Sequence, residues 1–442
     1  MRRGRNGQRR KLSAGSVFVL VLLAVTLAGS ALVLGRLSSG TSVDLNKLKV
    51  NLLNIEETPI PESSPESRSK PAEEETDRPE GDKVTPPPLV NEALPAEKKG
   101  STFTLTAAGS IALTGEVRKN SWSSESRVYD YSDVMMLLAP QIRADASVVF
   151  TENLFSDNYK VNDTVAPESA ANLAKEAGFS YAACGFSQAY SHGKDGIETT
   201  LMALDERNLT PLGLRYADDN DIPTVKAISG VKTVFLQYTA TVSSKTRKTM
   251  EKEGASGMIP EADPEKIARD ISAARERGAE AVIVLLHWGR IGKDPDSSQK
   301  ELAASIARAG ADLIIGNGSH VPQSAEYLTG RDNGTVLCVW SLGSLLSGDR
   351  GNAKRMSGYL FHVTIRSNGK GGVDVLNPEY TPVYTWKYKQ DGRYYYRCIT
   401  VSGQIPDGMD AEQIKSMKKA DEAVTAVMNN SPLSRRGELY ED

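Results

Sequence analysis

Three apolar stretches in the second half of the chain end abruptly in polar, glycine-containing loops. They read AVIVLLHWG (281–289), GADLIIGNGSHV (310–321) and VLCVWSLGS (336–344). Short runs of this kind, rich in β-branched residues, are typical of buried parallel strands. In α/β proteins the functional groups follow the carboxyl ends of such strands. We therefore expect His287 and His320, which come at the ends of two of these runs, to lie at one edge of one sheet.

The same succession of apolar strand and polar loop is present earlier in the chain. Strands are predicted at 103–111, 144–152 and 179–185. Further strands are expected at 209–213, 231–240, 359–365 and 373–384, and helical or amphipathic segments at 166–177, 197–207, 263–278 and 410–428. Repeated strand–loop–helix units predict a largely parallel, layered α/β domain. The polar tail after Asn429 is expected to be frayed.

The N-terminus has the pattern of a membrane segment. A cluster of basic residues within positions 1–11 precedes 24 uncharged, mainly apolar residues from Leu12 to Gly35. A helix needs about 20 such residues to cross a bilayer core. Because basic flanks stay in the cytoplasm, the rest of the chain is expected outside the cell, held by this single anchor. The small residues at 28–31 leave open a cleaved signal peptide and a secreted protein.

Amino-acid composition divides the rest of the chain into a spacer, a folded domain and a C-terminal part. Residues 36–100 include a stretch rich in Pro, Glu, Ser and Lys and are predicted to be a disordered spacer. The folded domain is expected at 101–400, and a C-terminal helix and tail at 401–442. The formal net charge of −3 gives no reason to expect nucleic acid binding. The three cysteines are far apart and are expected to be buried thiols.

The loops after the strands resemble those of the CapA family of bacterial poly-γ-glutamate capsule proteins. Its members typically show a GD loop, NLE, ANNH, HWG, GHHPH and SLGNF in this order. Here the corresponding places read AAGSI, FTENL, CGFSQAYSHG, LLHWG, GNGSHV and SLGSLL, over roughly residues 102–365. The resemblance implies an α/β/β/α sandwich of two layered sheets, similar to calcineurin-like metallophosphatases. An anchor followed by a spacer also resembles the usual layout of the family.

The resemblance also implies a two-metal site, but this chain departs from it at most metal-ligand positions. Ser110 stands in place of Asp, Phe186-Ser187-Gln188 in place of Asn-Asn-His, Asn317-Gly318 in place of paired His, and Ser344 in place of Asn. Serine and glutamine are poor ligands for divalent metals. No tightly bound metal is therefore expected, although Glu152, His287 and His320 remain as a possible set for one Zn²⁺ or Mn²⁺ ion.

The candidate cleft comprises seven side chains from the loops after the strands: Ser110, Glu152, Ser187, Gln188, His287, Asn317 and His320. Arg118 and Arg290, next to these loops, could supply charge for an anionic polymer. The resemblance implies a role in capsule or surface-polymer synthesis or export, as a non-catalytic binding or assembly subunit. The expected partners are the membrane, the surface polymer and capsule-synthesis membrane proteins. The alternatives are a metal-dependent hydrolase of a polyanion and a cell-surface interaction module.

Overall fold

The computed structural model describes residues 100–219, 224–401 and 404–437. The predicted anchor at 12–35 and nearly all of the predicted spacer at 36–100 lie outside these ranges. Across the described ranges, no helix combines the length and the hydropathy that crossing a bilayer requires. The described residues belong to the compact unit that spans 93–442.

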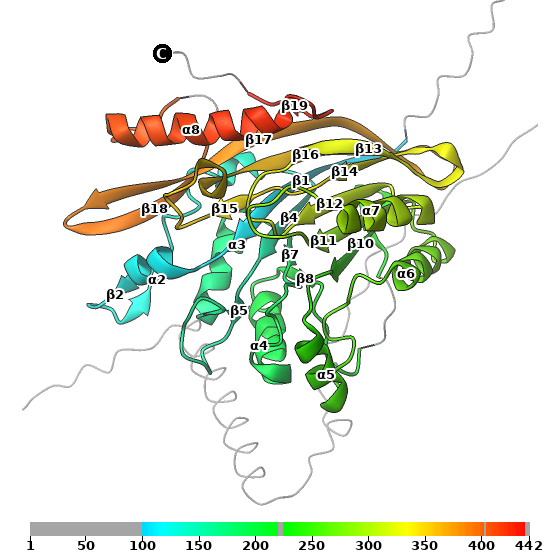
Figure 1. Ribbon diagram of the computed structural model, residues 1–442, viewed down its shortest axis with the longest axis horizontal. Helices are drawn as coiled ribbons and strands as arrows, with labels where there is room; N and C mark the ends of the chain where they lie inside the picture. Colours follow the sequence, from blue (N-terminus) through cyan, green and yellow to red (C-terminus); the bar gives the residue numbers. More distant parts are fainter. Residues whose placement is uncertain (1–99, 220–223, 402–403, 438–442) are drawn as a thin grey trace, which may run out of the picture. The chain divides into compact units, whose positions relative to one another are not determined.

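Two mixed β-sheets form the centre of the protein (Figure 1). The first sheet contains β1 (Thr102–Ile111), β4 (Ala146–Thr151), β7 (Tyr181–Ala183), β8 (Thr210–Leu212), β15 (Ser344–Leu346), β16 (Ser357–Ser367), β17 (Val373–Gln390), β18 (Arg393–Thr400) and β19 (Ser434–Arg435). The second contains β9 (Lys226–Ile228), β10 (Val231–Thr239), β11 (Ala281–His287), β12 (Leu313–Asn317), β13 (Ala325–Thr329) and β14 (Thr335–Val339). Two short pairs, β2–β3 (Trp122–Ser123, Val128–Tyr129) and β5–β6 (Leu154–Phe155, Val165–Ala166), stand apart.

Seven α-helices are described: α2 (Gly115–Ser121), α3 (Asn172–Glu176), α4 (Gly193–Asp205), α5 (Ser244–Lys252), α6 (Pro264–Glu276), α7 (Ser297–Ala309) and α8 (Ala411–Met428). Aspartate side chains cap α6, α7 and α8 at their N-termini. In α6 the buried Ile267, Ile271 and Ala274 lie on one face, which packs on the second sheet.

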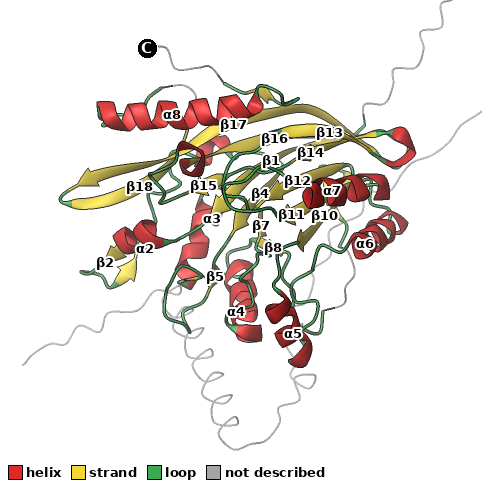
Figure 2. Cartoon of the chain, in the orientation of Figure 1, coloured by secondary structure: helices red, strands yellow, loops and turns green. Residues whose placement is uncertain are grey.

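The sheets pack face to face with helices outside them (Figure 2), which confirms the predicted α/β/β/α sandwich. The core between the sheets contains Phe103 and Leu105 from β1 and Ile283 and Leu285 from β11. A second core lies between the second sheet and α6 and α7, and a third between the first sheet and α3 and α4. Each sheet therefore buries both faces, as continuous apolar strands require.

The structure corrects several details of the sequence-based prediction. The strands β1, β4, β7 and β8 are mutually parallel, and so are β10, β11, β12 and β14. However, β16, β17 and β18 extend the first sheet in antiparallel fashion, so this sheet is mixed. The second sheet is parallel at its centre and has antiparallel strands, β9 and β13, only at its two edges. The predicted helix at 166–177 is reduced to a 3₁₀ turn and the short α3.

The C-terminal tail is the other correction, because it is not frayed along its described length. After α8, residues Ser434 and Arg435 pair with β17 as β19. Arg435 also forms an ion pair with Asp421 of α8 at 2.9 Å and donates a hydrogen bond to the carbonyl of Val401. The C-terminal segment is therefore fastened to the first sheet.

Candidate functional site

A polar cluster forms where the parallel strands of both sheets end. Ser110 lies near the end of β1 and Glu152 directly follows β4, both in the first sheet. His287 and Asn317 are the last residues of β11 and β12 in the second sheet, and they are register partners. His320 comes three residues after β12. Parallel strands place their carboxyl ends at a common edge, and the two sheets bring these edges together.

Hydrogen bonds join four of these side chains into one network. One carboxylate oxygen of Glu152 accepts a short hydrogen bond from the Ser110 hydroxyl. The other lies 2.6 Å from Nε2 of His320. Asn317 Nδ2 donates to Ser110 Oγ at 2.6 Å, and Ser341 Oγ donates to Asn317 Oδ1 at 3.2 Å. Both carboxylate oxygens of Glu152 are thus occupied by side chains of the protein.

His287 sits beside this network without completing it. Its Nδ1 lies 3.3 Å from the Thr241 hydroxyl, and its Nε2 lies 3.7 Å from the nearer Glu152 oxygen. The Nε2 atom is buried and has no hydrogen-bond partner in the structure. A Cβ added at Gly318 would lie 3.2 Å from the His287 ring, so the glycine lets the loop after β12 pass close to this ring.

The charges of Glu152 and His320 depend on each other. Burial alone would raise the pKa of Glu152, but the adjacent His287 and His320 hold its pKa well below the usual range. Burial alone would lower the pKa of His320, yet the contact with Glu152 raises its pKa above the usual value. Both shifts favour the ion pair, because each partner stabilises the charged form of the other.

The backbone that carries His320 is strained. His320 has φ 57, in the left-handed region that non-glycine residues seldom adopt. Its neighbour Ser319 is buried and donates a bifurcated hydrogen bond to the Val321 carbonyl and to Ser341 Oγ, both at 3.0 Å. This tight turn directs His320 toward Glu152, and such strain is characteristic of functional or tightly determined sites.

The remaining predicted cleft residues lie apart from this network. Gln188 is exposed and accepts a long hydrogen bond from Thr164 at 3.4 Å, and Ser187 is half-buried. In the described part of the chain, no hydrogen bond joins either of them to Ser110, Glu152 or the two histidines. Their neighbour Phe186 packs in the core outside the first sheet.

Sequence analysis missed three polar residues of the site: Thr241, Ser319 and Ser341. Each comes two residues after the end of an apolar strand of the second sheet. That position is the signal that could have identified them. Arg118 and Arg290, in contrast, are paired with carboxylates, since Arg118 lies 3.1 Å from Asp163 and Arg290 lies 3.7 Å from Asp296.

The side chains of the cluster do not fit a two-metal centre. Among the described residues, no group of three or more His, Cys, Asp and Glu side chains is placed to hold a metal ion. Ser110, Asn317 and Ser344 offer only neutral oxygens or amides at the positions where the family resemblance would place metal ligands. Glu152, His287 and His320 are the nearest approach to a ligand set, with the Glu152 carboxylate bonded to Ser110 and His320.

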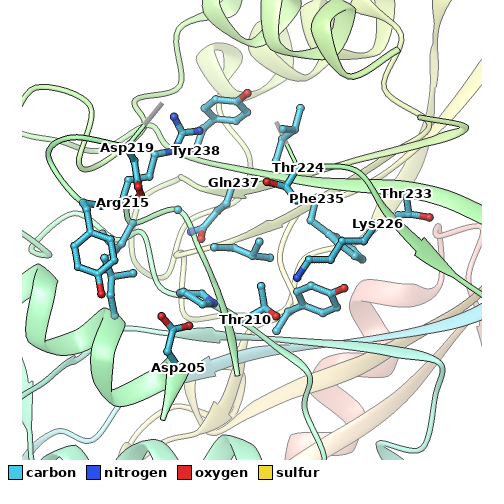
Figure 3. A pocket seen from close by; sticks show the side chains of 18 residues that line it. Asp205, Thr210, Arg215, Asp219, Thr224, Lys226, Thr233, Phe235, Gln237 and Tyr238 are labelled. Carbon is cyan, nitrogen blue, oxygen red and sulfur yellow. Dashed lines mark hydrogen bonds between the residues drawn. The ribbon is translucent and has the colours of Figure 1, made fainter. Parts of the chain in front are cut away.

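A separate cavity of about 430 Å³ opens between the edges of the two sheets, near β8 and β10 (Figure 3). Its lining includes charges of both signs, Asp205 and Asp219 with Arg215 and Lys226. None of the predicted cleft residues lines it. Gln237 forms part of its wall and exchanges hydrogen bonds with the backbone of Gly185, in the loop after β7.

The structure therefore defines a two-sheet α/β/β/α protein with a polar cluster at the shared carboxyl edge. Residues 104–349 match the family model of the bacterial capsule synthesis protein PGA_cap. This match covers more than half of the chain, and the chain belongs to that family. It confirms the resemblance inferred from the loops.

Two curated relatives are similar to the chain. The PGA biosynthesis protein CapA of Bacillus subtilis (strain 168) is 29% identical over 228 residues, which cover 50% of this chain and 57% of that protein. The capsule biosynthesis protein CapA of Bacillus anthracis is 28% identical over 218 residues, covering 48% of this chain and 50% of that protein. The matches thus span only about half the length of these relatives.

Among solved structures, the calcineurin-like phosphoesterase YfkN from Bacillus subtilis overlaps with the protein at a TM-score of 0.38. The two are 12% identical, and the overlap covers 74% of this chain and 99% of that one.

Proposed function

We propose that this protein takes part in the synthesis or export of a capsule or related surface polymer, of the poly-γ-glutamate type, as a membrane-anchored extracellular subunit. In this proposal it binds or assembles components of the machinery and does not hydrolyse phosphoesters. The role in capsule synthesis is supported by membership of the family and by the names of the two relatives. The anchor is supported by the basic cluster and the apolar run at 12–35.

The observation that supports a non-catalytic role is the closed hydrogen-bond network around Glu152. Its carboxylate accepts from Ser110 and pairs with His320, while Ser110 is in turn bonded to Asn317. A buried polar network whose members satisfy one another fixes the structure of a site. It leaves no carboxylate oxygen of Glu152 without a protein partner, which favours a positioning role over metal chemistry.

The test is made in the organism that carries the gene. Deleting the gene should reduce extracellular polymer to background, and re-expression of the full-length chain should restore it. Fractionation of the restored cells should place the full-length chain in the membrane pellet, accessible to added protease. Unchanged polymer in the deletion strain would contradict the capsule role and favour a cell-surface interaction module. A shortened, soluble chain beginning near Leu32 would replace the anchor with a cleaved signal peptide.

A metal-dependent hydrolase is the second candidate, and one observation favours it. The buried Nε2 of His287 has no hydrogen-bond partner among the described residues and lies 3.7 Å from the Glu152 carboxylate. A neutral imidazole nitrogen of this kind is a common zinc ligand, and with Glu152 and His320 it would leave one coordination position open. Such an ion would act as a Lewis acid toward a phosphoester.

The proposal predicts that the purified full-length chain carries far less than one equivalent of metal. Phosphodiesterase activity with added Mn²⁺ or Zn²⁺ should remain at background, and His287→Ala should not change it. Elemental analysis and a chromogenic phosphodiester assay measure both. Stoichiometric metal, together with turnover abolished by His287→Ala and unaffected by His192→Ala, a change of a half-buried histidine outside the cluster, would establish the hydrolase instead.

A further inference from the structure

One end of the β17–β18 hairpin extends beyond the rest of the first sheet (Figure 1). The pairing of β17 with β16 ends where Tyr384 faces Ser357. From Thr385 onward β17 pairs only with β18, in a two-stranded ribbon that closes at the turn between Gln390 and Arg393. We call residues 385–398 the arm. The arm lies outside residues 104–349, the part of the chain that the family model matches.

Lysines alternate with aromatic residues along β17 in the arm, and two arginines flank three successive tyrosines along β18. Lys387 Nζ lies 4.2 Å from the ring centroid of Tyr394, and Lys389 Nζ lies 5.7 Å from the same ring. On the other face, the rings of Tyr388 and Tyr395 stack with centroids 5.5 Å apart, and the Arg393 guanidinium lies 5.8 Å from the Tyr395 ring. These distances fall within the range of cation–π attraction.

The charges of the arm have predominantly one sign. Residues 385–398 contain four basic side chains and a single acidic one, Asp391, although the whole chain has a net charge of −3. Arg397 forms an ion pair with Asp133 at 3.1 Å. Within the described ranges, no carboxylate lies within ion-pair distance of Lys387 or Lys389. Lys389, Arg393 and Tyr394 are exposed, with Tyr394 41% accessible.

Stabilisation of the ribbon explains part of this composition. A two-stranded ribbon gains little from its backbone alone, and cross-strand pairs such as Tyr388–Tyr395 hold it together. Charged residues on an edge strand also discourage aggregation. Neither requirement explains why four of the five charged residues of the arm are basic. Rigid rings that hold lysines in place suit recognition of a flexible anion, because less side-chain entropy is lost on binding.

We propose that the arm binds a linear polycarboxylate chain, with Lys387 and Lys389, which share one face of the arm, contacting successive carboxylates and the Tyr394 ring on that face packing against the polymer backbone. The charge complementarity of the arm supports an anionic polymer, and the choice of a polycarboxylate rests on the proposed function. The arm is a separate surface from the Glu152 cluster. It would hold polymer near the protein without taking part in any reaction.

The test measures binding of fluorescently labelled poly-γ-glutamate to the full-length chain in detergent, by anisotropy. The double variant Lys387→Glu/Lys389→Glu should weaken binding roughly tenfold or more, because exposed ion pairs of this kind are replaced by repulsions. Binding by the unmodified chain should also decline with added salt. The matched control is Lys245→Glu/Lys248→Glu, two exposed lysines on α5, which should leave binding unchanged. Thermal unfolding confirms that both variants are folded.

Three further probes, a neutral polymer, anionic lipid vesicles and single-stranded DNA, identify the occupant. Labelled dextran, a neutral polymer, should not bind. Equal losses in the arm variant and the α5 control would overturn the proposal in favour of general charge attraction. Binding of anionic lipid vesicles or single-stranded DNA that depends on the arm, without poly-γ-glutamate binding, would also overturn it. Because this assay requires no capsule, its failure is distinguishable from that of the proposed function, which is tested by polymer levels in the deletion strain.

Discussion

Replacing Glu152 with Ala is expected to lower the free energy of unfolding by about 3–5 kcal/mol, the usual cost of removing one member of a buried charged cluster. The carboxylate is only 11% exposed and is the common partner of Ser110 and His320. Its loss leaves the imidazole of His320 without a counter-charge. Urea unfolding of the full-length chain in detergent, followed by tryptophan fluorescence, measures the change.

The control is Glu301→Ala on the exposed face of α7, which should stay within about 0.5 kcal/mol of the unmodified chain. A loss of less than 1 kcal/mol for Glu152→Ala would show that the network contributes little to stability. In that case the closed network could not be the reason for regarding the site as structural.

The stabilisation from Glu152 should depend on pH in both directions. The lowered pKa of Glu152 gives a contribution that is fully present above its ordinary value of 4.5 and is lost as the pH falls toward the folded-state value. The raised pKa of His320 gives one that is fully present below 6.5 and is lost as the pH rises through the folded-state value. The difference between the unmodified chain and Glu152→Ala should therefore be largest between these two values, with a chelator present.

Gly316→Ala is expected to destabilise the protein by about 3–5 kcal/mol, from overpacking and a broken buried hydrogen bond together. A Cβ at Gly316 would lie 2.6 Å from Cε2 of the Trp288 indole and would also collide with the Trp340 carbonyl. At present the indole nitrogen of Trp288 donates to that carbonyl at 2.9 Å. The added methyl group must displace the indole and break this bond.

Gly351→Ala is the matched control, because a Cβ there meets only the Asp349 carboxylate at an ordinary 3.9 Å. Its midpoint of urea unfolding should stay close to that of the unmodified chain. If Gly316→Ala also leaves the midpoint unchanged, the two tryptophans have room to move and the packing at the end of β12 is looser than the structure indicates.

The sequence predicts the parallel strands well because each is a continuous apolar run with a glycine-containing loop. This pattern predicted that His287 and His320 lie at one edge of a sheet. It also predicted that Ser110, Glu152 and Asn317 lie in the same cleft. It predicted the antiparallel strands β16 and β17 as well, at 359–365 and 373–384, but it missed β18. The strand β18 reads RYYYRCIT, in which two arginines flank three tyrosines, and no long apolar run marks it.

The contacts inside the site could not be predicted from the sequence. Nothing local indicates that Ser187 and Gln188, which follow β7, would lie apart from residues that follow the neighbouring strand β4. Ser187 and Gln188 lie in the turn at 187–192, next to Phe186, which is buried in the core outside the first sheet. Likewise, the pairing of Glu152 with His320 joins residues 168 positions apart and depends on the positive φ of His320.

The position of β1 in the first sheet affects how the chain folds. β1 lies between β4 and β16, and the hydrogen bond from Thr106 to His362 spans 256 residues. A ribosome adds about 5–20 residues per second, so an early strand waits on the order of tens of seconds for its second neighbour. During this interval one edge of β1 is unpaired and open to other strands. Because this pairing joins distant parts of the chain, we expect the first sheet to form slowly. A chaperone that covers the unpaired edge of β1 would therefore assist folding.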